Sequence, residues 1–93
     1  MLTGIFCFYD KKQAMYLPPF SMQTRGAAIR MFLDMVNTPN DQSMVYKYLE
    51  DFDLYELATF DVDEGVITPI QRNYICNGLS LKDSIDQSAA QVP

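Results

Sequence analysis

The stretch Leu2-Thr3-Gly4-Ile5-Phe6-Cys7-Phe8-Tyr9 carries apolar or aromatic side chains on both of its alternating faces. Such a run is typical of a strand in the middle of a sheet, covered on both sides. A polar break of turn length follows at residues 10–13, and residues 14–17 are apolar enough to pair back as a hairpin. Pro18 and Pro19 end this second strand because proline has no N–H to donate to a ladder. The sequence therefore predicts two adjacent strands, over 2–9 and 14–17.

The next segment has the pattern of an amphipathic helix over residues 25–36. Thr24 suits the N-cap position, and the large apolar residues recur at the three-to-four spacing of one helical face: Ile29, Phe32, Leu33 and Val36. Asn37 is expected to adopt the left-handed conformation that ends a helix. Arg30 and Asp34 lie four residues apart on the other side and are expected to pair weakly.

Weaker patterns occupy the rest of the chain. Residues 41–49 predict a shorter helix capped by Asn40 or Asp41, and residues 54–60 predict a strand. After a turn at 61–65, a returning strand over 66–68 is interrupted by Pro69, and residues 73–76 either continue it or form a last strand. A turn is expected at Asn77 and Gly78. The predicted fold is an α+β domain over residues 1–78, a two-layer structure with an antiparallel sheet and one main helix, followed by a tail over 79–93 that is a short helix or disordered.

One amphipathic helix can cover only one face of a sheet. Both faces of the 2–9 strand have the composition of buried surface, so another element must cover the second face. The 42–49 segment, the tail and a second copy of the chain are the candidates. We expect self-association as a homodimer or higher homo-oligomer.

Composition excludes several function classes. The chain has 93 residues, 48% of them hydrophobic, which leaves room for one small domain and no multidomain enzyme. No apolar run is long enough to cross a membrane, and the N-terminus lacks a signal-peptide pattern, so no membrane partner is expected. Histidine, the side chain most used for proton transfer, is absent. We therefore expect no enzymatic activity, no catalytic residue and no cofactor.

Metal chemistry is not expected either. Cys7 and Cys76 both lie in apolar runs and are predicted to be reduced, buried thiols, although a disulfide between them stays open. Two distant cysteines without histidine do not supply a zinc site. The segment Asp61-x-Asp63-Glu64-Gly65 lacks the spacing of an EF-hand calcium loop and predicts a polar turn.

The net charge of −5 is concentrated in residues 47–64, which hold one lysine and seven acidic residues. Such a segment is either a solvated face or a surface that docks a basic partner. The docking hypothesis involves Glu50, Asp51, Asp53, Glu56, Asp61, Asp63 and Glu64.

Aromatic and basic residues alternate in the first third of the chain. Aromatic rings that stack on bases, with cations that follow the phosphates, are what single-strand-binding surfaces use. The residues of this candidate nucleic-acid surface are Tyr9, Lys11, Lys12, Tyr16, Phe20, Arg25 and Arg30. The alternative is that the aromatic rings pack in the core or an interface and the lysines solubilise a turn.

Two blocks of sequence resemble a known family. The first is Tyr16-Leu17-Pro18-Pro19-Phe20, followed by Thr24-x-Gly26-x-Ala28-Ile29-Arg30-x-Phe32; the second is Glu50-Asp51-Phe52-Asp53-Leu54-Tyr55-Glu56-Leu57-Ala58-Thr59-Phe60-Asp61. Their order and spacing are similar to those of the small nonstructural protein of gokushoviruses, single-stranded DNA phages of the microvirus family. Ala58 departs from the glycine common in that family.

The resemblance implies a protein made in the infected cell and acting in the host cytoplasm, with a role in single-stranded genome synthesis or packaging. It carries no catalytic residues. We therefore expect a non-enzymatic accessory protein with phage replication or packaging proteins as partners. One alternative is a protein that binds single-stranded nucleic acid directly, and another is a host-directed inhibitor that docks its acidic segment.

Overall fold

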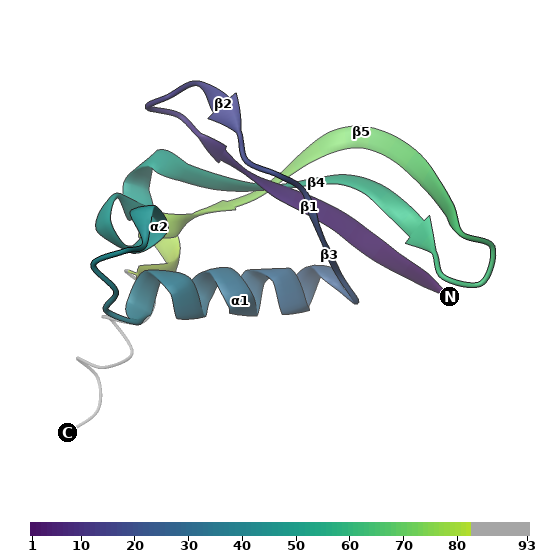
Figure 1. Cartoon of the computed structure of the whole chain (residues 1–93), viewed down its shortest axis with the longest axis horizontal. Helices are drawn as coiled ribbons and strands as arrows, with labels where there is room; N and C mark the ends of the chain where they lie inside the picture. The colour runs from purple at the N-terminus through teal and green to yellow at the C-terminus, as the bar shows by residue number, and fades with distance from the viewer. Residues whose placement is uncertain (83–93) are drawn as a thin grey trace.

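The computed structural model describes residues 1–82 of the chain. Five strands form one antiparallel sheet of order β2-β1-β4-β5, with β3 paired to the same edge of β1 as β2. The sheet curls over α1, which lies along one of its faces (Figure 1). The elements are β1 (Leu2–Asp10), β2 (Met15–Tyr16), β3 (Phe20–Met22), α1 (Arg25–Asn37), α2 (Met44–Lys47), the 3-10 helix η1 (Leu49–Asp51), β4 (Phe52–Asp61) and β5 (Val66–Asn77). The predicted α+β class is confirmed.

The core lies between α1 and the sheet. Phe6 and Phe8 point from β1 toward the helix, where Phe8 packs edge-to-face on Phe32 with ring centroids 4.8 Å apart. Phe52 and Leu54 of β4 extend this buried cluster. Burying large rings in this way supplies most of the stabilisation available to so small a domain.

Of the two predictions about the ends of α1, the one for the N-terminal end is confirmed and the one for the C-terminal end is wrong. The Thr24 hydroxyl accepts a hydrogen bond from the Ala27 N–H at 3.0 Å, which confirms the predicted N-cap. At the other end Asn37 is still helical, and its side-chain amide donates to the Leu33 carbonyl at 2.8 Å. The Thr38 N–H donates to the Asp34 carbonyl at 3.0 Å, and Thr38 leaves in an extended conformation, so the helix ends without a left-handed residue.

Three other features differ from the expected elements. β3 was not predicted, because its three residues are too few for a periodic signal. The second helix is capped by Ser43, whose hydroxyl accepts from the Tyr46 N–H at 3.2 Å, so the predicted caps at Asn40 and Asp41 are wrong. Pro69 does not interrupt β5, which continues to Asn77, because an edge strand does not need every N–H for pairing; of the two alternatives for residues 73–76, the one in which they continue the returning strand is confirmed.

Asn77 and Gly78 do not form the predicted turn. Asn77 ends β5, its side-chain oxygen accepts from the Leu79 N–H at 2.8 Å, and residues 78–82 are helical. Gly78 is buried against the carbonyl of Leu49, where a Cβ atom would overlap the backbone. The rest of the predicted tail, residues 83–93, lies outside the described residues. Within residues 1–82 no helix is long and apolar enough to cross a membrane.

Candidate functional site

A row of four tyrosines crosses the face of the sheet opposite α1. Tyr16, Tyr9, Tyr55 and Tyr74 come from β2, β1, β4 and β5, one from each strand in spatial order. Consecutive ring centroids are 4.5 Å apart for Tyr16 and Tyr9, 6.4 Å for Tyr9 and Tyr55, and 5.7 Å for Tyr55 and Tyr74. We call these four residues the tyrosine row. It places four tyrosine rings across the full width of the sheet, and the rings at its two ends are exposed.

Strand register brings the row together. Tyr9 pairs with Tyr16, and Tyr55 pairs with Tyr74. In β5 an extra residue, Ile75, is inserted between the Tyr74 and Cys76 positions. This bulge places Tyr74 on the tyrosine face while Ile75 and Cys76 pack against the core cluster.

Arg72 lies within the tyrosine row. The central carbon of its guanidinium is 5.4 Å from the Tyr16 ring centre and 5.0 Å from that of Tyr55, and its Nη1 donates a hydrogen bond to the Tyr16 hydroxyl. A second bulge surrounds Arg72, because residues 70–72 of β5 stand opposite the single residue Leu57 of β4. Bulges of this kind are frequent beside functional sites. The arrangement holds one cation among aromatic rings on an open surface.

The two ends of the row remain open to solvent. Tyr74 is 53% exposed and Tyr16 is 39% exposed, whereas Cys7 beneath them is fully buried. Burial raises the pKa of the Cys7 thiol, although the positive charge of Arg72 opposes the shift. Burial also raises the pKa of Tyr55, with a further increase from the carboxylate of Asp53. The Tyr55 hydroxyl therefore stays a neutral donor and acceptor at neutral pH.

Asp53 is a carboxylate close to Tyr55 and Tyr74, and its charge is compensated. It is buried, its Oδ1 accepts from the Asn77 amide at 2.8 Å, and the Lys11 ammonium lies 4.0 Å away. Lys11 and Lys12 lie in the exposed turn that joins β1 to β2. The row thus has one internal cation and two more at its β1–β2 end.

The structure does not gather the seven predicted nucleic-acid residues on one surface. Tyr9 and Tyr16 lie in the tyrosine row, but Phe20 packs on the other side of the sheet against Phe6 and Phe8. The remaining cations of the set, Arg25 and Arg30, belong to α1, and the first of them is paired with Glu56. Sequence reasoning missed Tyr55, Tyr74 and Arg72, since only the strand register shows that they join Tyr9 and Tyr16.

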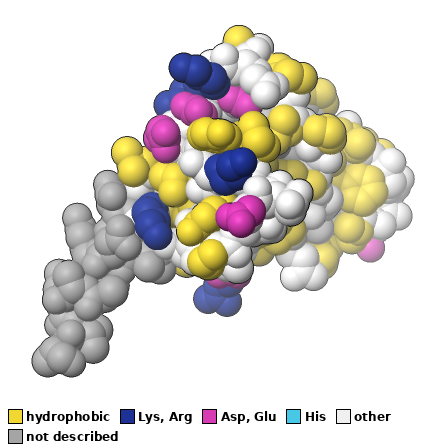
Figure 2. Space-filling model, turned by 60° about the vertical axis from the view of Figure 1, so that its left-hand side comes forward, with side chains coloured by type: hydrophobic (Ala, Val, Ile, Leu, Met, Phe, Trp, Pro, Cys, Tyr) yellow, Lys and Arg dark blue, Asp and Glu magenta, His cyan; other side chains and the backbone are white. Residues whose placement is uncertain are grey.

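The acidic segment is divided in a similar way. Glu56 is buried and accepts from the Arg25 guanidinium at 2.7 and 3.2 Å. Asp61 accepts from two N–H groups of the β4–β5 turn, and Asp63 pairs with the N-terminal ammonium. The carboxylates that remain exposed lie near the two ends of β4; Glu50, for example, comes shortly before the strand begins. Figure 2 shows basic and acidic side chains interspersed with hydrophobic ones at the α2 end, without a large patch of either sign.

The cysteines and the acidic turn need no metal to explain them. Cys7 faces the tyrosines and Cys76 faces the core, so both are free thiols on opposite sides of the sheet. No three cysteine or acidic side chains within residues 1–82 are placed to hold a metal ion together. Residues 61–65 form the tight turn that the sequence predicts, with Gly65 at a φ of 69°.

Comparison with known proteins shows that this chain is similar to phage proteins. Residues 3–81 match the family model described as Phage ORF5 protein. The chain belongs to this family. Protein ORF5 of Chlamydia phage 1 is 32% identical to it over 72 residues, which is 75% of each chain. No solved structure matches the chain. The resemblance to a small gokushovirus protein is therefore confirmed, and with it the assignment as a phage protein.

Proposed function

We propose that this phage protein is a non-enzymatic accessory factor that binds single-stranded DNA through the tyrosine row. The role we assign to it is in single-stranded genome synthesis or packaging, alongside phage replication or packaging proteins in the host cytoplasm. The observation that carries the proposal is the row itself, with Arg72 held between two of its rings.

Exposed rings across a sheet fit unpaired bases. Base–aromatic stacking contributes about 1–3 kcal/mol per base and tolerates any sequence, because every base has a π-face. The exposed rings of Tyr16 and Tyr74 offer two such platforms at opposite ends of the row. In a duplex the bases are already stacked on each other, so the row favours single strands.

The charges near the row fit a small number of phosphates. Arg72 lies inside it, and Lys11 and Lys12 lie at the turn beside Tyr9 and Tyr16. A guanidinium can bind a phosphate oxygen with two parallel N–H donors while its flat face stays on an aromatic ring. The proposal therefore assigns most of the affinity to stacking and a smaller part to these cations.

Fluorescence anisotropy with a labelled thymidine oligonucleotide tests the binding. Tyr74→Ala removes the more exposed ring of the row, and we expect it to weaken binding by roughly 10-fold or more, since about 1.4 kcal/mol corresponds to a factor of ten. Tyr48→Ala is the matched control, because Tyr48 is 43% exposed but follows α2 and lies on none of the four strands that carry the row. A duplex of the same length should bind far less well. Equal affinities for the two variants, or no binding at any salt concentration, would contradict the proposal.

The lysines give a second test of the same surface. Replacing Lys11 and Lys12 by alanine removes two cations from the end of the row. We expect weaker binding and a flatter dependence of the binding constant on salt, because fewer counterions are released. A salt slope identical to that of the wild type would remove the lysines from the interface and restrict it to the rings and Arg72.

Infection tests the biological role separately. A phage that encodes Tyr74→Ala should accumulate the duplex genome normally but yield less single-stranded DNA in the host. The ratio of the two forms is measured on blots of infected cells, with a Tyr48→Ala phage as the control. An unchanged ratio together with weakened binding in vitro would separate DNA binding from genome synthesis and point to packaging.

A further inference from the structure

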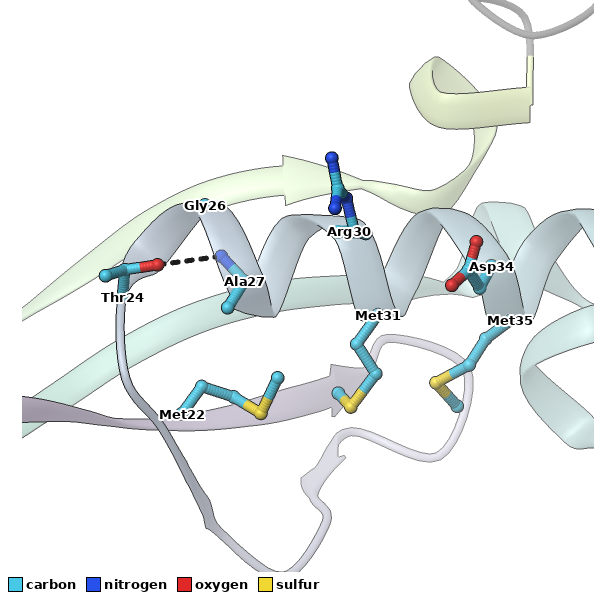
Figure 3. Close-up of a pocket in the computed structure, with 8 residues that line it drawn as sticks. All are labelled: Met22, Thr24, Gly26, Ala27, Arg30, Met31, Asp34 and Met35. Carbon is cyan, nitrogen blue, oxygen red and sulfur yellow. Dashed lines mark hydrogen bonds between the residues drawn. The ribbon is translucent and has the colours of Figure 1, made fainter.

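A methionine-lined groove runs along the side of α1. Met31 and Met35 of the helix and Met22 of β3 form a row below it, as Figure 3 shows. The groove has a volume of about 710 Å³, and all three methionines are half-buried along it. Flexible thioether side chains in an open groove are typical of surfaces that accept an apolar helix.

Two opposite charges flank the groove. Arg30 and Asp34 are both exposed on α1 and also line it. The weak pair predicted between them is not formed, and neither has an ion-pair partner among residues 1–82. Two unpaired charges of opposite sign, one helical turn apart, leave an electrostatic interaction available to a partner.

We infer that the groove binds α1 of a second copy of this chain, in an antiparallel pair about a two-fold axis. If two helices cross midway between Arg30 and Asp34, the Arg30 of one copy lies opposite the Asp34 of the other, and the same contact forms twice. That crossing also brings Met31 and Met35 of each copy beside those of its counterpart. A single charge pattern thus complements itself, as an isologous interface requires.

The size of the helix limits the strength of this dimer. Thirteen residues of α1 span about 20 Å. Such a contact buries less than the ~800 Å² per partner of a standard stable interface. We therefore expect a weak dimer, so that monomer and dimer coexist at workable concentrations. The pairing leaves the tyrosine row free and does not depend on the proposed DNA binding.

Sedimentation equilibrium of the full chain and of charge-reversal variants tests the pairing. Arg30→Asp alone, and Asp34→Arg alone, each turn both intermolecular contacts repulsive and should raise the dissociation constant about 10-fold or more. An equimolar mixture of these two variants should dimerise again, because every contact across the axis then joins opposite charges. Lys12→Asp makes the same charge change as Arg30→Asp but lies away from α1, and it should dimerise like the wild type.

Each further outcome decides for or against the inference. The double exchange Arg30→Asp with Asp34→Arg should restore the dimer within one chain, which also serves if one single variant fails to fold by circular dichroism. A wild-type chain that stays monomeric at about 500 µM would overturn the pairing. So would single reversals that dimerise normally, or a mixture that associates no better than its components.

Discussion

Replacing Arg72 by methionine separates the structural and the binding roles of the tyrosine row. Methionine keeps an aliphatic stem but removes the guanidinium that lies 5.4 Å from the Tyr16 ring centre and 5.0 Å from that of Tyr55. Each cation–π contact contributes about 0.5–1 kcal/mol at an exposed site, so the free energy of unfolding should fall by about 1–2 kcal/mol. Urea unfolding measures this loss. Arg72→Lys keeps the charge without the flat surface and should recover only part of it.

The same variants are expected to behave differently toward single-stranded DNA. Losing one phosphate contact makes the slope of log K against log salt less steep by about 0.7 for a single strand. Arg72→Met should therefore bind roughly 10-fold more weakly at low salt with a flatter slope, whereas Arg72→Lys should keep the slope. If Arg72→Met loses stability but retains wild-type affinity and slope, then Arg72 only braces the rings and our assignment of a phosphate contact is refuted.

Three further perturbations follow from the packing, each measured by urea unfolding. Arg25→Met leaves the buried carboxylate of Glu56 without its ion-pair partner and should lower the free energy of unfolding by about 1–3 kcal/mol. Adding Glu56→Gln to this variant should recover part of the lost stability. If the effects of the two substitutions simply add, the pairing is contradicted. Gly78→Ala puts a Cβ into a backbone carbonyl and should cost about 1–3 kcal/mol, whereas in the control Gly26→Ala the Cβ makes only an ordinary contact, 3.8 Å from the Thr24 hydroxyl oxygen; equal stabilities would refute the close contact at Gly78. Burial raises the pKa of Tyr55 above its ordinary value of 10.0, so the contribution of this hydroxyl to the free energy of unfolding is complete below pH 10 and is lost as the pH rises further. Tyr55→Phe should therefore reduce the loss of stability at alkaline pH. An unchanged loss in this variant would show that Tyr55 is not its cause.

The parts of the fold that could be predicted are those in which a local sequence pattern is enough to define a helix or strand. The spacing of apolar residues fixed the position of α1, and the doubly apolar run indicated that β1 is central. The predictions at Asn37 and Pro69 were wrong for a common reason. Each residue has a usual role in isolation, but here Asn37 uses its side chain on the Leu33 carbonyl and Pro69 lies on an edge strand. Tertiary position overrode local preference in both cases.

The site was only half predictable. Tyr9 and Tyr16 face each other across a short hairpin, so their neighbourhood follows from local sequence. Tyr55 and Tyr74 join them only through long-range strand register, and the bulge at Ile75 decides which face Tyr74 takes. A bulge leaves no mark in apolar alternation that distinguishes it from an irregular strand. Phe20 shows the opposite error, because an aromatic residue of the motif packs into the core.

The net charge of −5 is compatible with DNA binding only if stacking supplies most of the affinity. Asp53 lies close to the row but is buried with Asn77 and Lys11 as partners, and Glu56 is paired with Arg25, while Asp63 lies at the far turn beside the N-terminus. The remaining carboxylates therefore repel a strand on the row only in a general way. Charges separated by more than about 10 Å are largely screened at 0.1 M salt. Affinity should therefore rise at first as salt screens this general repulsion, and fall slowly beyond that as the contacts of Arg72 and Lys11 weaken. A basic single-strand binder with many phosphate contacts would instead lose affinity steeply from the lowest salt upward, and such a curve for this chain would show that phosphates, not rings, dominate.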